Sequence, residues 1–235
     1  MKNILITGSN GFLGSALVER LSGSDVNVLP VTRNTSYEEM DEMVKVADYC
    51  YHFAGEVNPK ASYEKFYSAN VELTAKLLGL LRSHPIPVVF SSTIHAGHTN
   101  SSYGNTKLEA ENMIFEYGRS VSVPVHICKL PHLFGIGAKP DHNSILATWI
   151  CNAIHGRELV VYDEQYTINY MCVEELVDYF IEQMHSEITL SLPSTYPITL
   201  GELRDTILDM SNNPFYKPSS LFGKKLHKVF LSINK

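Results

Sequence analysis

Two periodicities of hydrophobic residues alternate along the first part of the chain. Short apolar runs rich in β-branched residues predict buried strands, and longer segments with apolar positions three and four residues apart predict helices. The predicted strands are residues 4–7, 26–31, 49–53 and 88–91, and the predicted helices are residues 12–21, 36–47 and 63–81. Strands that alternate with helices imply a parallel sheet covered by helices on both faces. We therefore expect an α/β protein with a doubly wound parallel sheet.

Three glycines at a spacing of three follow the first strand, at Gly8, Gly11 and Gly14. In such a turn the first glycine adopts backbone angles that a side chain forbids, the second lets a ligand approach, and the third lets helix and strand pack closely. The free N–H groups at the helix start then favour a phosphate. Strand, turn and helix together predict a Rossmann-like pyrophosphate site, although glycine turns without ligands also occur. The cofactor-binding residues predicted here are Gly8, Asn10, Gly11, Phe12, Leu13 and Gly14.

The residues that follow the second and third strands bear on the choice of cofactor. In a dinucleotide fold the position after the second strand faces the adenosine ribose, where an acidic residue binds a free 2′-OH and an arginine suits a 2′-phosphate. Here that position is Arg33, which favours NADP(H); the alternative is a solvated loop cation. Ala54 and Gly55 follow the third strand, and their small size would let the cofactor lie against the backbone.

A tyrosine and a lysine stand four residues apart at the start of another predicted helix, as Tyr103 and Lys107. This spacing places the phenol and the ammonium on one helix face. A phenol with a pKa near ~10 is a poor acid or base at neutral pH unless a neighbouring cation stabilises its anion, so the pair forms a tunable acid/base. The pattern is common by chance on exposed helix faces. Here it follows a glycine turn and a strand that ends in the hydroxyls of residues 91–93.

Composition limits the classes of partner. The chain has 235 residues, of which 44% are hydrophobic, enough for one domain or for one domain with a small appended lobe. Its net charge of −6, from 25 acidic and 19 basic residues, argues against a nucleic-acid surface and favours a small partner. No segment approaches the ~18 apolar residues of a membrane span, and Met1 leads directly into a strand without room for a signal peptide. We expect a cytoplasmic protein that binds no membrane.

Cysteine and histidine usage favours neither disulfides nor a metal site. The four cysteines lie far apart without a C-x-x-C pair, which indicates reduced, mostly buried thiols. His95 and His98 come nearest to ligand spacing, yet no acidic or cysteine partner is close to them in the sequence. We therefore expect no metal.

These motifs together resemble those of extended short-chain dehydrogenases/reductases of the nucleotide-sugar epimerase/dehydratase group. The resemblance covers about residues 1–210 and rests on the glycine turn of 7–14, the hydroxyl-bearing strand end and the Tyr-x-x-x-Lys pair. It implies that Tyr103 shuttles a proton, and that Lys107 holds the nicotinamide ribose and lowers the tyrosine pKa.

The same resemblance assigns roles to three further side chains. A Ser or Thr hydroxyl hydrogen-bonds the substrate oxygen in this family, and that role would fall on Thr93, with Ser92 as its rival. Asn70 begins an Asn-Val pair that is similar to a helix motif of the family, whose asparagine lies near the active site. The resemblance thus adds Thr93, Ser92 and Asn70 to the candidate site.

Later segments resemble a narrower group, the reductase domain of bifunctional enzymes that make UDP-N-acetyl-L-fucosamine precursors for bacterial capsule and O-antigen. The matching segments are 130–135, 139–148, 169–170 and 199–202. The resemblance implies NADPH-dependent reduction of the 4-keto group of a UDP-2-acetamido-2,6-dideoxy-hexos-4-ulose. In that group a C-terminal cupin domain epimerises the sugar. No cupin-like strand series precedes Lys235, so we expect either an excised domain or a stand-alone reductase.

Departures from the wider group favour net reduction. Its dehydratases place Asp-Glu directly after the catalytic threonine, whereas this chain has Ile94-His95, which disfavours dehydration. Its epimerases usually hold NAD tightly with an acidic residue after the second strand, and Thr32-Arg33 fits a releasable NADPH better. The usual Arg-Asp, whose arginine binds the substrate diphosphate, is replaced by Ile168-Asn169. Lys139 and Asn143 are then candidates for the phosphate and uridine side, with a plain loop charge as the alternative for Lys139. His132 follows a proline where the loop of this group nears its substrate, with a structural histidine as the alternative.

The whole chain is expected to form one unit with two parts. The NADP(H)-binding core takes in about 1–130 and 166–190, and a small C-terminal substrate lobe takes in about 131–165 and 190–235. A helix predicted from the spacing at 221–233 either packs on this lobe or contacts a further domain or second subunit. The expected function is reduction of a nucleotide-linked keto-sugar. The alternatives are an epimerase or a non-catalytic NADP(H)-binding regulator. A homodimer is left open.

Overall fold

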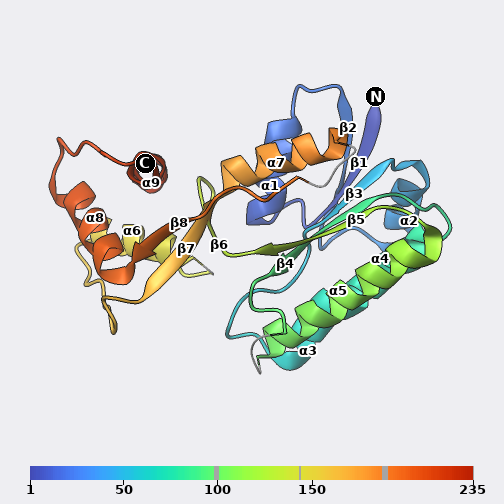
Figure 1. Cartoon of the computed structure of the whole chain (residues 1–235), viewed down its shortest axis with the longest axis horizontal. Coiled ribbons are helices and arrows are strands. Elements are labelled where there is room, and N and C mark those ends of the chain that lie inside the picture. The colour runs from blue at the N-terminus through green and yellow to red at the C-terminus, as the bar shows by residue number, and fades with distance from the viewer. Residues whose placement is uncertain (98–100, 143, 187–189, 235) are drawn as a thin grey trace. The chain divides into compact units, whose positions relative to one another are not determined.

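The apolar runs of the first half of the chain form a five-stranded, wholly parallel sheet, seen in the computed structural model in Figure 1. The structure describes residues 1–97, 101–142, 144–186 and 190–234. The strands lie in the order β2-β1-β3-β4-β5, so the chain reverses direction across the sheet between β2 and β3. Their bounds are β1 (Lys2–Thr7), β2 (Val26–Val31), β3 (Tyr49–His52), β4 (Val88–Thr93) and β5 (Val125–Leu130).

Helices cover both faces of this sheet. One face carries α2, α4 and α5, which pack through Met40, Leu77 and Ile114 onto strand residues such as Leu5 and Phe90. Helix α1 packs against β1 and β2. The helix bounds are α1 (Phe12–Leu21), α2 (Tyr37–Val46), α3 (Tyr63–Tyr67), η1 (Ser68–Glu72), α4 (Leu73–Leu81) and α5 (Ser102–Val121). The predicted doubly wound parallel sheet is confirmed.

The long helix predicted over 63–81 is interrupted. A π-helical turn, η1, separates α3 from α4 and buries Asn70 and Val71. The hydrophobic spacing alone could not show this, because one widened turn leaves the apolar positions on the same side. Such turns occur often at functional sites.

The second half of the chain builds a separate, mixed sheet of order β6-β7-β8. Strands β6 and β7 are parallel, and β7 and β8 are antiparallel. Helices α6, α8 and α9 contact one another and share a core that includes Phe134, Ile150, Leu203, Leu226 and Phe230. Packing on α6 and α8 therefore accounts for the apolar face of α9. The bounds are β6 (His132–Phe134), α6 (Ile145–Ile154), β7 (Thr167–Cys172), α7 (Val173–His185), β8 (Tyr196–Thr199), α8 (Leu200–Asn212) and α9 (Leu221–Ile233).

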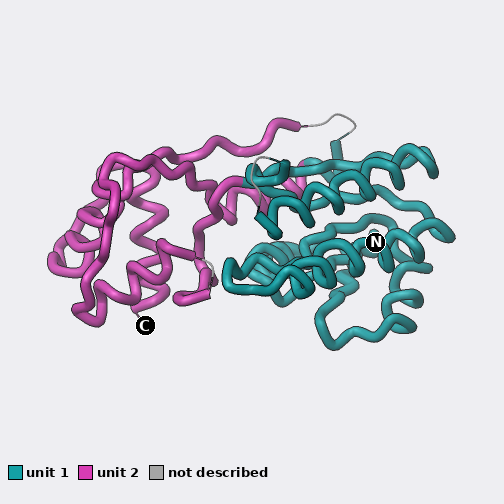
Figure 2. The backbone as a smooth tube through the Cα atoms, turned by 90° about the horizontal axis from the view of Figure 1, so that it is seen from below, with its two compact units in different colours: residues 1–130, 183–189 teal, residues 131–182, 190–235 magenta. Residues whose placement is uncertain are grey.

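The chain divides into two compact units, shown in different colours in Figure 2. Unit 1 comprises residues 1–130 and 183–189, and unit 2 comprises residues 131–182 and 190–235. Residues 166–182 thus differ from the prediction, which placed them in the nucleotide-binding core. The reason is that β7 hydrogen-bonds to β6 and β8 and not to the five-stranded sheet. None of the helices in the described ranges is long and apolar enough to cross a membrane.

Candidate active site

The glycine turn of unit 1 is held by close backbone packing. Gly8 has a φ of +70°, and a Cβ there would lie 2.7 Å from the backbone nitrogen of Ala54. A Cβ on Gly14 would overlap the carbonyl oxygen of Gly8, whereas one on Gly11 would lie 3.1 Å from that oxygen. Only glycine therefore fits at Gly8 and Gly14, as the sequence predicted. Gly11 is the least constrained by packing and lies exposed beside Asn10 at the tip of the turn.

The start of α1 is suited to an anion. Its N-cap is Gly11, which has no side chain to accept a hydrogen bond, and its first turn holds no acidic residue. The first intrahelical bond runs from the Ser15 N–H to the Gly11 carbonyl, so the N–H groups of Phe12, Leu13 and Gly14 precede it. These N–H groups and the positive end of the helix dipole fit a pyrophosphate.

Arg33 follows β2 and its side chain is 86% exposed. Its Nη2 lies 4.0 Å from Oε2 of Glu56, and the same oxygen lies 3.0 Å from Nζ of Lys65. Glu56 is buried and accepts the N–H groups of Val57 and Asn58 at 3.0 and 2.9 Å. Burial raises the pKa of Glu56, but these N–H groups and Lys65 outweigh it and keep the pKa below its usual value. Glu56 is therefore an anion, and Lys65 is its nearer cationic partner. The Arg33 guanidinium remains largely exposed to solvent.

Ala54 and Gly55 lie in the loop after β3, and Asn70 fixes that loop. Asn70 Oδ1 accepts the N–H of Glu56 at 2.9 Å, and its Nδ2 donates to Thr106 Oγ1 at 3.1 Å. A Cβ on Gly55 would lie 2.7 Å from Asn70 Oδ1, so this loop needs glycine for the contact. Asn70 is only 2% exposed, and its side-chain amide is hydrogen-bonded to Glu56 and Thr106. Its amide therefore positions protein groups.

Tyr103 in the first turn of α5 meets Thr93 at the end of β4. Their side chains are hydrogen-bonded, and burial raises the pKa of Tyr103 above its usual value while this bond opposes the rise. The expected lowering of the tyrosine pKa by Lys107 is not found. Tyr103 is therefore a neutral phenol at physiological pH.

Lys107 is buried and points back toward β4. Its Nζ donates to the Ser91 carbonyl at 2.6 Å and lies 4.0 Å from the centre of the Phe90 ring. Burial lowers the pKa of Lys107 to about 7, against the opposing effect of the Glu111 carboxylate one helical turn away. These contacts hold the amino group of Lys107 against strand β4.

Thr93 and Ser92 point in different directions, which decides between them as the hydroxyl beside Tyr103. The Ser92 hydroxyl donates to Oε1 of Glu111, and Oε2 of that carboxylate lies 3.3 Å from Nζ of Lys129. Ser92 is thus committed to a buried carboxylate. Glu111 was missed by the sequence reasoning, although its place four residues after Lys107 could have pointed to the same helix face.

The predicted substrate-binding residues His132 and Lys139 belong to unit 2. His132 lies on β6, and Lys139 is exposed. The His132 ring lies 6.1 Å from that of Tyr170. Asn143 lies outside the described residues. Their roles toward a substrate stay predictions.

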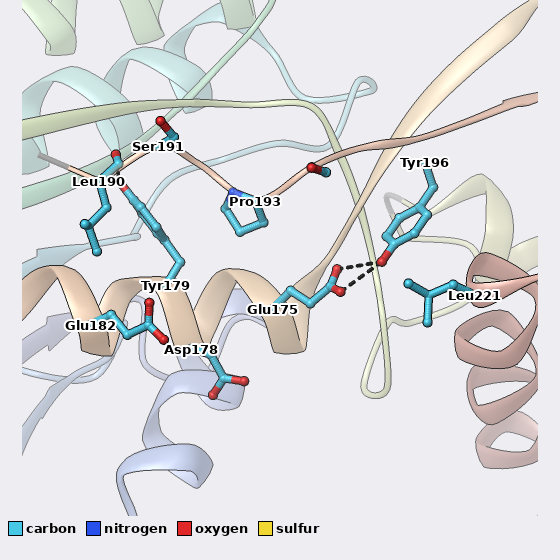
Figure 3. A pocket seen from close by; sticks show the side chains of 10 residues that line it. Glu175, Asp178, Tyr179, Glu182, Leu190, Ser191, Pro193, Tyr196 and Leu221 are labelled. Atoms are coloured by element: carbon cyan, nitrogen blue, oxygen red, sulfur yellow. Dashed lines mark hydrogen bonds between the residues drawn. The ribbon is translucent and has the colours of Figure 1, made fainter.

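A depression of about 640 Å³ lies in unit 2 along α7 (Figure 3). Three carboxylates line it, Glu175, Asp178 and Glu182. Tyr196 donates to both oxygens of Glu175, at 2.9 and 3.1 Å. Such a lining repels phosphate groups, so this depression is not suited to a diphosphate.

Residues 4–188 match the NAD dependent epimerase/dehydratase family. The chain belongs to this family. By its description the family depends on NAD, so the group that the glycine turn and the start of α1 are suited to hold is a nicotinamide cofactor. The sequence-based resemblance to this family is confirmed.

Relatives within the epimerase/dehydratase family include enzymes acting on nucleotide sugars. A UDP-2-acetamido-2,6-beta-L-arabino-hexul-4-ose reductase of Pseudomonas aeruginosa is 30% identical over 236 residues, which cover 97% of this chain and 63% of that protein. UDP-glucuronic acid decarboxylase 5 of Arabidopsis thaliana is 23% identical, over 89% of this chain and 74% of that protein.

Solved structures give the same picture of the fold. The capsular polysaccharide assembling protein CapF of Staphylococcus aureus superposes with a TM-score of 0.87 at 28% identity, over 98% of this chain and 64% of that one. A UDP-glucose 4-epimerase of Thermotoga maritima superposes with a TM-score of 0.86 at 16% identity, over 98% of each chain, which shows the shared fold. This chain spans a little under two thirds of the length of the Pseudomonas reductase and of CapF.

Proposed function

We propose that this protein reduces the 4-keto group of a nucleotide-linked 6-deoxy-hexosulose, of the UDP-2-acetamido-2,6-dideoxy type, with NADPH, as a step in making surface-polysaccharide precursors. The observation that carries the proposal is the hydrogen-bonded pair of Tyr103 and Thr93, with Lys107 four residues along the same helix, in the unit that holds the glycine turn. The name of the Pseudomonas relative supports the keto-sugar, and the name of CapF supports the link to capsule.

The chemistry of Thr93 and Tyr103 indicates the step of the reduction in which each would act. When bound, NADPH supplies the hydride that adds to the carbonyl carbon. Thr93 orients the carbonyl oxygen, and Tyr103 donates its proton to that oxygen as negative charge develops on it. The ketone thus becomes a secondary alcohol, with the hydride on carbon and the phenolic proton on oxygen. Because burial raises the pKa of Tyr103, the phenol stays protonated until this step.

NADPH is proposed over NADH because of the charges after β2. Arg33 is exposed, and the position holds no carboxylate that would accept a hydrogen bond from a free 2′-OH. The nearby carboxylate of Glu56 has Lys65 at 3.0 Å, so it does not cancel the Arg33 charge. A 2′-phosphate would find an exposed guanidinium there, whose one ion pair among the described residues is the 4.0 Å contact with Glu56.

The test is NADPH oxidation with freshly prepared UDP-4-keto-6-deoxy-N-acetylhexosamine, followed by loss of the near-ultraviolet absorbance of the reduced nicotinamide. Tyr103→Phe should lower kcat by a factor of about 10²–10⁴, the usual worth of a general acid. Tyr162→Phe, which removes the same atom from a 98% exposed tyrosine, should leave kcat unchanged.

Three outcomes would contradict parts of the proposal. Full activity of Tyr103→Phe would remove the assigned proton donor. Product formed without release of a stoichiometric amount of NADP⁺ would indicate an epimerase on the same scaffold. NADPH binding without any turnover of the keto-sugar would exclude this substrate and favour a binding protein.

A further inference from the structure

Five buried polar residues of unit 1 are linked by hydrogen bonds into one series, which we call the polar spine. Four of them take part through their side chains, and Asn70 takes part through both its main-chain carbonyl and its side-chain amide. Their exposures lie between 0% and 2%. Across the described residues, no buried side-chain nitrogen or oxygen atom lacks a hydrogen-bond partner. The members of the polar spine are Thr7, His52, Thr74, Asn70 and Thr106.

The positions of the hydrogen atoms follow from counting donors. Thr74 Oγ1 lies 2.6 Å from the main-chain carbonyl oxygen of Asn70, which can only accept, so the single hydroxyl hydrogen of Thr74 is used there. Thr74 Oγ1 also lies 2.8 Å from His52 Nε2. Nε2 must therefore carry a hydrogen and donate it to Thr74. His52 is the Nε2–H tautomer or the doubly protonated cation.

The other side of the ring decides between these two forms. Thr7 Oγ1 lies 2.6 Å from His52 Nδ1 and accepts the N–H of Ala54 at 3.2 Å. With a neutral ring, Thr7 donates its hydrogen to Nδ1, and every hydrogen in the chain has an acceptor. With a protonated ring, Nδ1–H would donate to Thr7 Oγ1, and the Thr7 hydroxyl hydrogen would have no acceptor among the contacts of the described residues. Burial and the charge of Lys107 lower the pKa of His52 to about 3, in agreement with a neutral ring.

The spine continues from η1 to the helix that carries the proposed proton donor. Asn70 Nδ2 donates to Thr106 Oγ1 at 3.1 Å, and Thr106 Oγ1 donates to the carbonyls of Ser102 and Tyr103, at 2.9 and 3.1 Å. One end of the spine is thus Thr7, adjacent to Gly8 of the glycine turn. The other end is Thr106, adjacent to Lys107.

We propose that the polar spine positions the glycine turn and the Tyr103–Lys107 segment relative to each other, with His52 as a neutral Nε2–H imidazole at its centre. The hydroxyl hydrogens of Thr7 and Thr74 and the Nε2–H of His52 each have one assigned acceptor, so this series favours one arrangement of the segments that it joins. Five apolar residues of similar volume would fill the same space without fixing that arrangement. The role of the spine in turnover and the use of NADPH as the binding probe rest on the proposed function, whereas the tautomer of His52 does not.

The first test needs no variant. Nitrogen-15 NMR of histidine-labelled protein should show His52 with a protonated Nε2 and an unprotonated Nδ1, unchanged between about pH 5 and 8, where an ordinary histidine titrates. A protonated Nδ1, or titration of His52 in this range, would overturn the proposal.

The second test separates the effect of the Thr74 hydroxyl from the effect of the volume of its side chain. Thr74→Val should weaken NADPH binding, measured by calorimetry, by about tenfold, which corresponds to ~1.4 kcal/mol. Thr74→Ser restores the hydroxyl and should return affinity to within about twofold. The control is Thr206→Val in α8, which removes a hydroxyl that also donates to the carbonyl four residues earlier. Equal NADPH affinity in Thr74→Val, Thr74→Ser and wild type would overturn the proposal.

Failure of the proposed function is distinguishable from failure of the spine. Wild-type protein that binds NADPH but does not oxidise it with the keto-sugar would refute the function and leave both tests in force. If turnover occurs, Thr74→Val should lower kcat at saturating NADPH while Thr74→Ser restores it. A Thr74→Val variant with weaker NADPH binding and an unchanged kcat would refute the coupling to Tyr103.

Discussion

Thr93 and Ser92 are neighbours in the sequence with different partners in the structure, and this difference predicts different losses. Thr93→Val should lower kcat by about 10²-fold, because it removes the hydroxyl proposed to orient the carbonyl oxygen. Ser92→Ala should leave the chemistry intact but lower the free energy of unfolding by about 1–3 kcal/mol, since Glu111 loses a buried donor. Steady-state kinetics and urea unfolding measure the two effects. A larger kcat loss in Ser92→Ala than in Thr93→Val would reverse the assignment.

Lys107 provides a prediction about pH. Burial lowers its pKa to about 7, so the free protein loses this positive charge as pH rises through that value. If the ammonium helps to hold the cofactor, kcat/KM for NADPH should fall above about pH 7, because this parameter reports ionisations of the free enzyme. Lys107→Arg, which keeps its charge at higher pH, should move this limb upward. A flat profile up to the titration of ordinary lysines would contradict the prediction.

The lowered pKa of His52 predicts how the stability of the fold depends on pH. Its pKa falls from 6.5 to about 3 on folding, so between these values the unfolded chain binds a proton that the folded chain excludes. The free energy of unfolding should therefore decrease as pH falls, with a contribution from His52 of about 1.4 kcal/mol per pH unit. His52→Gln cannot titrate, so its stability should fall less steeply over the same range. Chemical denaturation at several pH values gives both slopes, and parallel slopes would refute the buried neutral imidazole.

At the scale of elements, the glycine turn was predictable because its constraints are local. The spacing of three glycines between a strand and a helix determined which residues must lack a side chain, and Gly8 and Gly14 prove to be the ones without room. The π-helical turn η1 was not predictable. Its widened register depends on where Asn70 and Thr74 find partners in β3, α5 and the loop after β3, and none of these is a neighbour in the sequence.

A glycine of the turn, Gly14, and a glycine of helix α4, Gly79, provide a matched pair of variants. Gly14→Ala places a Cβ into the Gly8 carbonyl oxygen, so it should open the turn and weaken NADPH binding by at least about tenfold. Gly79→Ala in α4 meets no atom within 4 Å and should raise the free energy of unfolding by up to about 1 kcal/mol through helix propensity. Calorimetry and thermal unfolding measure the two effects. Unchanged NADPH affinity in Gly14→Ala would contradict the packing argument.

At the scale of the whole molecule, the class of the fold followed from strand and helix alternation, but the boundary between the units did not. Residues 167–172 carry the β-branched and aromatic pattern of a buried strand, which is the same whether the strand joins one sheet or the other. Long-range pairing with β6 and β8 decides the matter. The roles of His132 and Lys139 were likewise not predictable from the local sequence, because they depend on what unit 2 binds.

Lys139 is predicted to contact the phosphate side of the sugar nucleotide, and the glycine turn is proposed to hold the cofactor, which predicts separable effects. Lys139→Met should raise the KM for the keto-sugar about tenfold, through loss of one charged contact to phosphate, and leave the NADPH dissociation constant unchanged. Lys217→Met, also at an exposed lysine of unit 2, should change neither. Equal effects of the two substitutions would remove Lys139 from the proposed phosphate site.

The central claim is that hydride passes from NADPH to the carbonyl carbon of a nucleotide sugar while Tyr103 protonates the oxygen. The most direct measurement is a single turnover with NADPH deuterated at C4 of the nicotinamide, followed by mass spectrometry and NMR of the sugar. The account predicts one deuterium at C4 of the product sugar with wild-type protein and little product with Tyr103→Phe. A product without deuterium, or with deuterium at another carbon, would contradict it.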